Sequence, residues 1–304
     1  MNESNIQSYI DRHLTIRKKE KDRYGEVFTP YEFIEEIMNN LPSKVWSNKD
    51  LCWLDPCSGT GNFMAVAYVK LMKGLHKHFP DPKKRKTHIL QNMLYMVELN
   101  PNNAKQLTTL FGKSANVCQS NFLDSSEKWM DGLGKKHFDI IVGNPPFQTK
   151  KSKPYEGSVG NRTLWTKFLD FIFNEQLLTS NGYLGFITPS NWRRPKHPLY
   201  DLLTRQNYLS YLHIYGKKEG LKKFSAQTRF DVYIVQEGTK NTSKNTKIID
   251  EKGEKRVLDL TSWPFLPNFS YEKIEKIMVQ KDKGIEILFD AGLYDARKLS
   301  KKKS

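Results

Sequence analysis

The stretch FDIIVGNPPFQTK, residues 138–150, joins an apolar run to a rigid bend. The run FDIIVG has the length and composition of a short buried strand. Two prolines follow, and because proline lacks a backbone N–H and fixes φ, they end the strand. Asn144 and Phe147 are therefore expected on a rigid bend at a strand end. In open α/β sheets, ligands bind at the carboxyl ends of strands.

Strand-like and helix-like segments alternate on both sides of this stretch. Apolar runs predict further strands at 51–55, 93–99, 116–119, 182–189, 208–215 and 229–236. Helices are expected at 5–21, 31–41, 62–79, from Pro101 onward and at 161–178, and a surface loop at 80–86. This alternation predicts an α/β fold, a doubly wound and mostly parallel, Rossmann-like sheet with a small C-terminal appendage. We expect a helical segment at 1–22, a main domain at 23–236 and a small C-terminal segment at 237–304.

The chain is strongly basic. It has 304 residues, with 49 Lys and Arg against 33 Asp and Glu, giving a formal net charge of +16. This charge favours a polyanionic partner, with nucleic acid first. The excess of Lys and Arg is marked within 148–223 and 240–304, which could flank a substrate groove or form a solvated face.

Three cysteines, Cys52, Cys57 and Cys118, have neither CxxC spacing nor a partnered His. The pattern predicts no metal site and indicates free thiols in a reducing compartment. The polar, charged N-terminus does not resemble a secretory signal, and no apolar run approaches membrane-spanning length. We expect a cytoplasmic or nucleoid-associated protein.

The segment LDPCSGTGNF, residues 54–63, joins a predicted strand to a helix. Asp55 ends the strand, and Gly59 and Gly61 permit close backbone approach and unusual φ angles. The next strand ends in Glu98, and an acidic residue there can bind ribose hydroxyls. Neither a Walker loop nor the dinucleotide fingerprint is present. Together these features predict an adenosine-containing ligand.

The order of motifs adds a resemblance. They run RYGEVFTP (23–30), LDPCSGTGNF (54–63), YMVELN (95–100), SNFLD (120–124), GNPPF (143–147), GYLGFITPSNW (182–192) and KFSAQTRFDVYIV (223–235). In this order the chain resembles the S-adenosylmethionine-dependent DNA N6-adenine methyltransferases of restriction–modification systems, with the γ order of motifs. The resemblance covers roughly residues 20–236 and implies a methyltransferase domain at 23–236.

The resemblance also implies roles for individual residues. Thr29 and Pro30 would hold the methionine end of S-adenosylmethionine, and Glu98 would bind its ribose. Phe122 would pack on the cofactor's adenine, although core packing is an equal alternative for this ring. Asn121 stands where the family usually has Asp, so it adds a donor and lacks the charge.

The NPPF bend suits methylation of an amine. The amino nitrogen of adenine is a poor nucleophile, and two acceptors aimed at its N–H bonds favour a more tetrahedral geometry. Asn144 offers a side-chain carbonyl and Pro145 a backbone carbonyl, and Pro146 helps to fix both. Phe147 offers a flat face for a base, which must flip out of a duplex to reach this pocket.

The resemblance implies that Phe224 closes the other side of the base, with Phe230 as the alternative and core packing open for both. Basic residues on either side of the bend are expected to contact phosphates of double-stranded DNA: Lys150, Lys151, Lys153, Arg193, Arg194 and Lys196. Arg193 and Arg194 could instead read bases. RNA or protein-glutamine methylation, and a non-catalytic DNA-binding subunit, remain alternatives. A specificity or restriction subunit is a possible partner.

Overall fold

A computed structural model describes residues 28–124, 127–147, 163–224, 227–238 and 245–278 of the chain. The helix predicted at 5–21 and the predicted phosphate contacts Lys150, Lys151 and Lys153 lie outside these residues.

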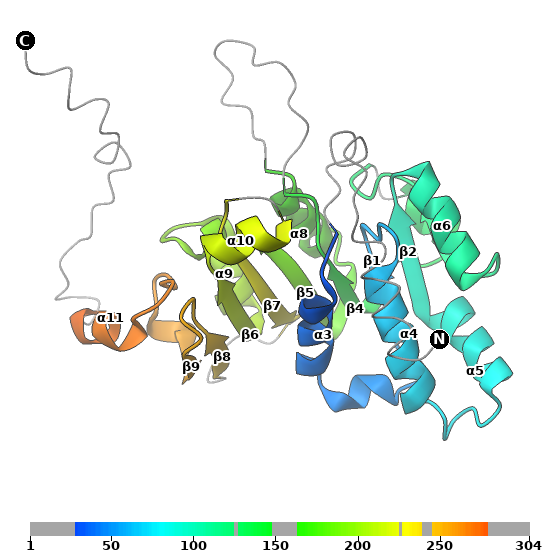
Figure 1. Cartoon of the computed structure of the whole chain (residues 1–304), viewed down its shortest axis with the longest axis horizontal. Coiled ribbons are helices and arrows are strands. Elements are labelled where there is room, and N and C mark those ends of the chain that lie inside the picture. The colour runs from blue at the N-terminus through cyan, green and yellow to red at the C-terminus, as the bar shows by residue number, and fades with distance from the viewer. Residues whose placement is uncertain (1–27, 125–126, 148–162, 225–226, 239–244, 279–304) are drawn as a thin grey trace, which may run out of the picture. The chain divides into compact units, whose positions relative to one another are not determined.

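The described residues form one nine-stranded sheet with the order β3-β2-β1-β4-β5-β7-β6-β8-β9 (Figure 1). The strands are β1 (Trp53–Asp55), β2 (Leu94–Glu98), β3 (Asn116–Gln119), β4 (Phe138–Gly143), β5 (Leu178–Pro189), β6 (Tyr208–Tyr215), β7 (Phe230–Gln236), β8 (Thr246–Ile249) and β9 (Lys255–Leu258). Strands β3, β2, β1, β4 and β5 pair in parallel, as does β6 with β8. Strand β7 lies antiparallel between β5 and β6, and β9 is antiparallel to β8. The predicted α/β fold with a mostly parallel sheet is confirmed.

Every strand that the sequence predicted is present, because each is an apolar run bounded by turn residues. The strand predicted at 182–189 begins earlier, at Leu178. Strands β8 and β9 were not predicted. They are short, and exposed Lys247 and Lys255 interrupt the apolar pattern.

The helices are α3 (Tyr31–Asn40), α4 (Asn62–Gly74), α5 (Pro82–His88), α6 (Pro101–Phe111), α7 (Glu127–Leu133), α8 (Trp165–Asn174), α9 (Pro198–Asp201), α10 (Lys217–Phe224) and α11 (Tyr271–Ile277). The loop predicted at 80–86 is wrong, because most of this segment belongs to α5. The Asp81 side chain caps the helix by accepting a hydrogen bond from the Lys83 amide, and Pro82 occupies its first position. The expectation of a surface location holds, since α5 buries no residue.

Two clusters of side chains hold the helices on the sheet. Phe33 and Ile37 of α3 belong to a hydrophobic core with residues of α4, β4 and β7. A second, aromatic cluster surrounds Phe122, whose ring contacts Trp129 of α7 and Phe168 of α8. These clusters fix α3, α7 and α8, the elements that flank the strand ends described below.

The chain divides into two compact units, Met1–Asn268 and Phe269–Ser304, and α11 belongs to the second. Strands β8 and β9 lie beyond residue 236, where the sequence analysis placed a domain boundary, and they extend the sheet of the first unit. The extent of a functional methyltransferase domain remains a prediction. Within the described residues, no helix combines the length and the apolar character that a membrane crossing requires.

Candidate active site

Three strand ends lie together at the point where the order of the strands along the sheet reverses, between β1 and β4. Strand β1 lies between β2 and β4 and is parallel to both, so their carboxyl ends share one edge of the sheet. Asp55 ends β1, Glu98 ends β2, and Asn144 follows β4. In doubly wound sheets this switch point is where ligands bind.

The glycine-containing loop between β1 and α4 is fixed by a hydrogen bond to Glu98. Gly59 and Gly61 have positive φ angles of 52° and 88°, a region that glycine adopts without strain. Glu98 is buried, and its Oε2 accepts a hydrogen bond from the Gly59 amide at 2.6 Å, while its Oε1 accepts from the Asn100 amide at 2.7 Å. Glu98 is therefore a fixed acidic group at the loop rather than a solvated carboxylate.

Asp55 lies beneath the same loop and is 1% exposed. Its Oδ1 accepts a hydrogen bond from the Cys57 amide at 3.1 Å, whereas its Oδ2 has no hydrogen-bond partner among the described residues. A Cβ on Gly143 would lie only 3.2 Å from Oδ1, so glycine permits β4 to approach. Burial raises the pKa of Asp55 to about 8, and the charge of Glu98 adds to this shift.

Asn144 is oriented by a residue far away in the sequence. Its Nδ2 donates to Thr29 Oγ1 at 3.0 Å, across 115 positions of the chain. Thr29 is buried and does not cap α3, whose N-cap is Pro30 without a side-chain cap. Because the amide nitrogen is engaged, the buried Oδ1 of Asn144 is left as an acceptor without a partner in the described chain.

The aromatic residues expected to hold a base lie together. Phe147 is half-buried, and its ring meets that of Phe224 edge to face, with centroids 6.0 Å apart and planes at 70°. Two rings that sandwich a flat base lie parallel and about 7 Å apart, twice the carbon–carbon contact distance. The two rings must therefore separate or turn before a base fits between them. Phe224 and Phe230 are both buried members of the hydrophobic core, and Phe230 also stacks on Tyr215.

The predicted adenine-binding residues are engaged locally. Phe122 is buried, and its ring stacks on Phe168 with a centroid distance of 5.3 Å. The Asn121 side chain donates to Asp124 Oδ1 at 2.7 Å and accepts from the Leu123 amide at 3.2 Å. The cofactor roles of Asn121 and Phe122 stay predictions.

The prediction that Arg193 contacts DNA phosphates is wrong. Arg193 is only 3% exposed, and its Nε donates to the buried Asp231 carboxylate at 2.8 Å. Its terminal nitrogens donate to the Leu266 carbonyl and to Asn268 Oδ1, each at 2.8 Å. A short helical turn, Ser190–Arg193, directs this guanidinium inward, whereas the adjacent Arg194 is exposed.

One site residue was missed. Cys57 is a free thiol, as predicted, and its Sγ lies 3.4 Å from the position that a Cβ on Gly143 would take. Burial raises its pKa, so the thiol stays neutral beside Asp55. Its position inside the LDPCSGTGNF loop was the available signal.

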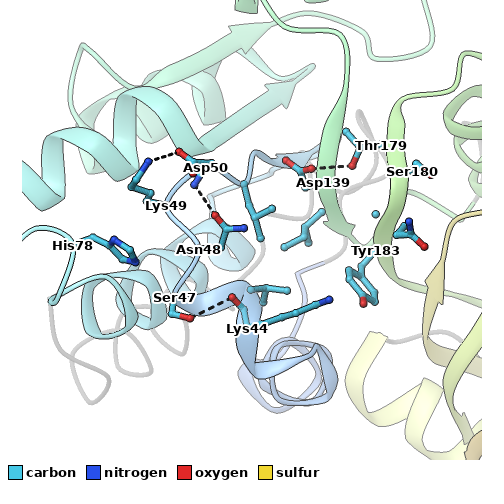
Figure 2. Close-up of a pocket in the computed structure, with 15 residues that line it drawn as sticks. Lys44, Ser47, Asn48, Lys49, Asp50, His78, Asp139, Thr179, Ser180 and Tyr183 are labelled. Carbon is cyan, nitrogen blue, oxygen red and sulfur yellow. Dashed lines mark hydrogen bonds and ion pairs between the residues drawn. The ribbon is translucent and has the colours of Figure 1, made fainter.

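A cavity of about 450 Å³ lies elsewhere, at the amino ends of β4 and β5 (Figure 2). None of the predicted site residues lines it. Asp139, which points toward it, is already bonded to the Cys52 amide and to Thr179 Oγ1, both at 2.8 Å. The residues at the carboxyl ends of β1, β2 and β4 therefore remain the candidate active site.

Comparison with known proteins agrees with this assignment. The model of the Eco57I restriction-modification methylase family matches residues 62–221, which is more than half of the chain. The chain belongs to this family.

Among curated relatives, an uncharacterized adenine-specific methylase of Mycoplasma pneumoniae is 26% identical over 238 residues, covering 55% of this chain and 55% of that protein. The type II methyltransferase M.VspI of a Vibrio species is 25% identical over 172 residues, covering 55% of this chain and 37% of that protein. The chain thus spans about half or less of the curated relatives that it matches.

Solved structures agree at the level of the fold. A structure of a type I restriction–modification system has a TM-score of 0.59 at 16% identity and covers 97% of this chain and 66% of that one. The M protein of the type I restriction enzyme EcoKI has a TM-score of 0.53 at 16% identity, covering 82% and 59%. The Eco57I-family chain therefore shares its fold with methyltransferases of restriction–modification systems.

Proposed function

We propose that the chain transfers a methyl group from S-adenosylmethionine to the N6 amino group of an adenine in DNA, as part of restriction–modification. The observation that carries this proposal is the unpartnered Oδ1 of Asn144 at the end of β4. A buried acceptor without a partner is costly, so its place at a strand-end site suggests a ligand donor. Membership of a restriction-modification methylase family supports the reaction class.

Asn144 and Pro145 would activate the amine. The amino nitrogen of the target base donates one hydrogen bond to Asn144 Oδ1 and one to the Pro145 carbonyl oxygen. These two hydrogen bonds direct the lone pair of the nitrogen toward the methyl donor. Thr29 holds the Asn144 amide in the required orientation before the substrate arrives. As positive charge develops on the nitrogen, the same two acceptors stabilise it. The methylated nitrogen carries one extra proton, which is acidic enough to pass to water, so a strong general base is not needed.

The strand-end residues fit a cofactor that carries positive charge. S-adenosylmethionine, when bound, supplies the methyl group on a sulfonium cation. Asp55 offers a buried and unpartnered carboxylate oxygen, and Glu98 a rigid carboxylate for ribose hydroxyls. Thr29 and Pro30 would lie at the methionine end, with Asn121 and Phe122 at the adenine.

A base in a duplex reaches Asn144 only after it leaves the stack. Phe147 then provides a ring face for it, and Phe224 shifts from its edge-on contact to admit it. Arg194 and Lys196 are exposed and remain candidates for phosphate contacts, whereas the buried Arg193 is no longer one. Lys150, outside the described residues, also remains a candidate. A separate specificity or restriction subunit could supply sequence recognition.

Incubation with methyl-labelled S-adenosylmethionine and DNA, RNA or protein, followed by nucleoside and amino-acid analysis, tests the proposal. Label in N6-methyladenine of DNA is the expected result. Asn144→Ala should abolish transfer while calorimetry shows retained cofactor binding, and Asn40→Ala, an exposed asparagine of α3, should change neither. Label in RNA or in glutamine would redirect the substrate, and no transfer in any arm would indicate a non-catalytic subunit.

A further inference from the structure

Helix α10 stands beside the candidate active site. It joins the end of β6 to the start of β7, where Tyr215 pairs with Phe230. Phe230 also pairs with Pro189 at the end of β5, whose parallel neighbour β4 leads into Asn144. The helix therefore lies over the same edge of the sheet as the NPPF bend.

The helix is fixed there by its buried face. Gly220 and Phe224 are its buried residues, four positions apart, and Phe224 contacts Phe147 of the bend. Lys223 forms an ion pair with Glu32 of α3. The rest of the helix is thus held at a set position relative to the ring that would receive a base.

The outer face of α10 is basic. Lys217, Lys218 and Lys222 are exposed, and no described residue forms an ion pair with any of them. Lys218 and Lys222 are four positions apart and share a face of the helix. The carboxylate of Glu219 lies near Gly216, within 3.0 Å of where a Cβ on that glycine would be. A free cationic surface therefore borders the aromatic pair.

We propose that the α10 lysines Lys217, Lys218 and Lys222 bind phosphates of duplex DNA next to the flipped adenine. The inference rests on the proposed function and adds to it the element that grips the duplex. Because Arg193 is buried in an ion pair, the positive charge for phosphate contact must come from other residues. Three lysines on a helix anchored to the base-binding ring can position the backbone beside the pocket.

The test compares two triple variants of equal charge. One replaces Lys217, Lys218 and Lys222 by Gln, and the control replaces Lys83, Lys84 and Lys86 of α5, which are also exposed. Figure 1 shows α5 well away from α10, and α5 leads into the amino end of β2 rather than the carboxyl edge. Gln retains good helix propensity, so both helices should persist.

Binding of a short fluorescent DNA duplex is measured at several salt concentrations. Loss of three phosphate contacts should make the slope of log K against log[salt] less steep by about 2.7. Between about 50 and 200 mM salt, the affinity of the α10 variant should therefore fall about 40-fold less than that of the wild type. The α5 variant should keep the wild-type slope. Both variants should bind S-adenosylmethionine as the wild type does, which shows that they are folded.

The outcomes separate the two proposals. Equal slopes for the α10 and α5 variants, with methylation of DNA intact in both, would overturn the α10 proposal alone. Tighter binding of duplex RNA than of DNA by the wild type would also overturn it. Failure of the wild type to methylate DNA would count against the proposed function instead. Methylation of the same adenines at a lower rate by the α10 variant at low DNA concentration supports the inference.

Discussion

Asp55 holds a proton in an unusual range of pH. The folded chain keeps this proton up to about pH 8, whereas the unfolded chain releases it near 3.8. The folded state thus binds more protons between these values, so the free energy of unfolding should fall as pH rises from about 4 to 8, by at most about 1.4 kcal/mol per pH unit. Urea denaturation of the cofactor-free protein across this range measures the fall.

Asp55→Asn is the matched control, because an amide cannot release the proton. The difference in unfolding free energy between wild type and variant should change through this range and level off above about pH 8. A difference that is constant with pH would mean that Asp55 is ionised in the folded chain. Calorimetry should also detect proton release near pH 7 when the cationic cofactor binds to the wild type.

Arg193 and Arg194 are neighbours with opposite expected behaviour. Arg193→Met leaves the buried Asp231 without its partner, and the loss of one member of a buried pair costs about 3–5 kcal/mol. Arg194→Met removes an exposed charge and should change the unfolding free energy by less than about 0.5 kcal/mol. Denaturant titration of both variants decides the matter, and equal stabilities would contradict the buried assignment.

These neighbours also show where sequence reasoning fails for single residues. The motif order located Asp55, Glu98 and Asn144 correctly at one sheet edge, because each ends or directly follows a recognisable strand. It could not distinguish Arg193 from Arg194, since the inward direction of Arg193 depends on a turn and on carbonyls more than 70 positions later. The Thr29–Asn144 hydrogen bond was invisible for the same reason.

At the scale of the element, one carboxylate adds a polar anchor to the apolar packing of α3. Glu36 accepts hydrogen bonds from the hydroxyls of Tyr211 and Tyr215 at 2.6 and 2.5 Å and from His213 Nδ1 at 2.7 Å. All three donors come from β6. Since α3 begins directly after Thr29 and Pro30, this anchor also holds the residue that orients Asn144.

Glu36→Ala should lower the free energy of unfolding by about 1–3 kcal/mol for each hydroxyl left without an acceptor, and should reduce methyl transfer by loosening Thr29. Unfolding titrations and transfer rates at saturating cofactor measure both effects. Asn40→Ala, exposed at the end of the same helix, is the control and should be nearly neutral. If the Glu36→Ala protein were destabilised but transferred methyl groups at the normal rate, the hydrogen bonds of Glu36 would not be needed to position Thr29.

Elements were predicted well where they carry an apolar pattern and poorly where they do not. Strands β1 to β7 follow from their runs, whereas α5 and α10 are rich in lysine and have little apolar periodicity. Helix α5 forms because Asp81 and Pro82 begin it, a local signal that the basic composition concealed. Helix α10 forms on tertiary contacts of Phe224, which no local pattern reveals.

At the scale of the whole molecule, the sheet depends on residues beyond the predicted boundary at 236. Strand β8 pairs with β6, and the Leu266 carbonyl accepts from buried Arg193. A chain ending at Asn268 should therefore fold and bind S-adenosylmethionine. The free energy of unfolding of a chain ending at Gln236 should be lower by several kcal/mol, or this chain should fail to fold. Circular dichroism and cofactor calorimetry on both truncations test this, and equal behaviour would restore the boundary at 236.

The anchor at Glu36 has a consequence for synthesis. Its three partners follow it by 175, 177 and 179 positions, so a ribosome adding about 5–20 residues per second delivers them roughly 10–35 s after Glu36 itself. During that interval α3 can meet β4, and Thr29 can meet Asn144, but no β6 exists to fix the helix. The nascent chain thus carries the residues of the candidate site before it can hold them in place, and the site is complete only after β6 has been synthesised.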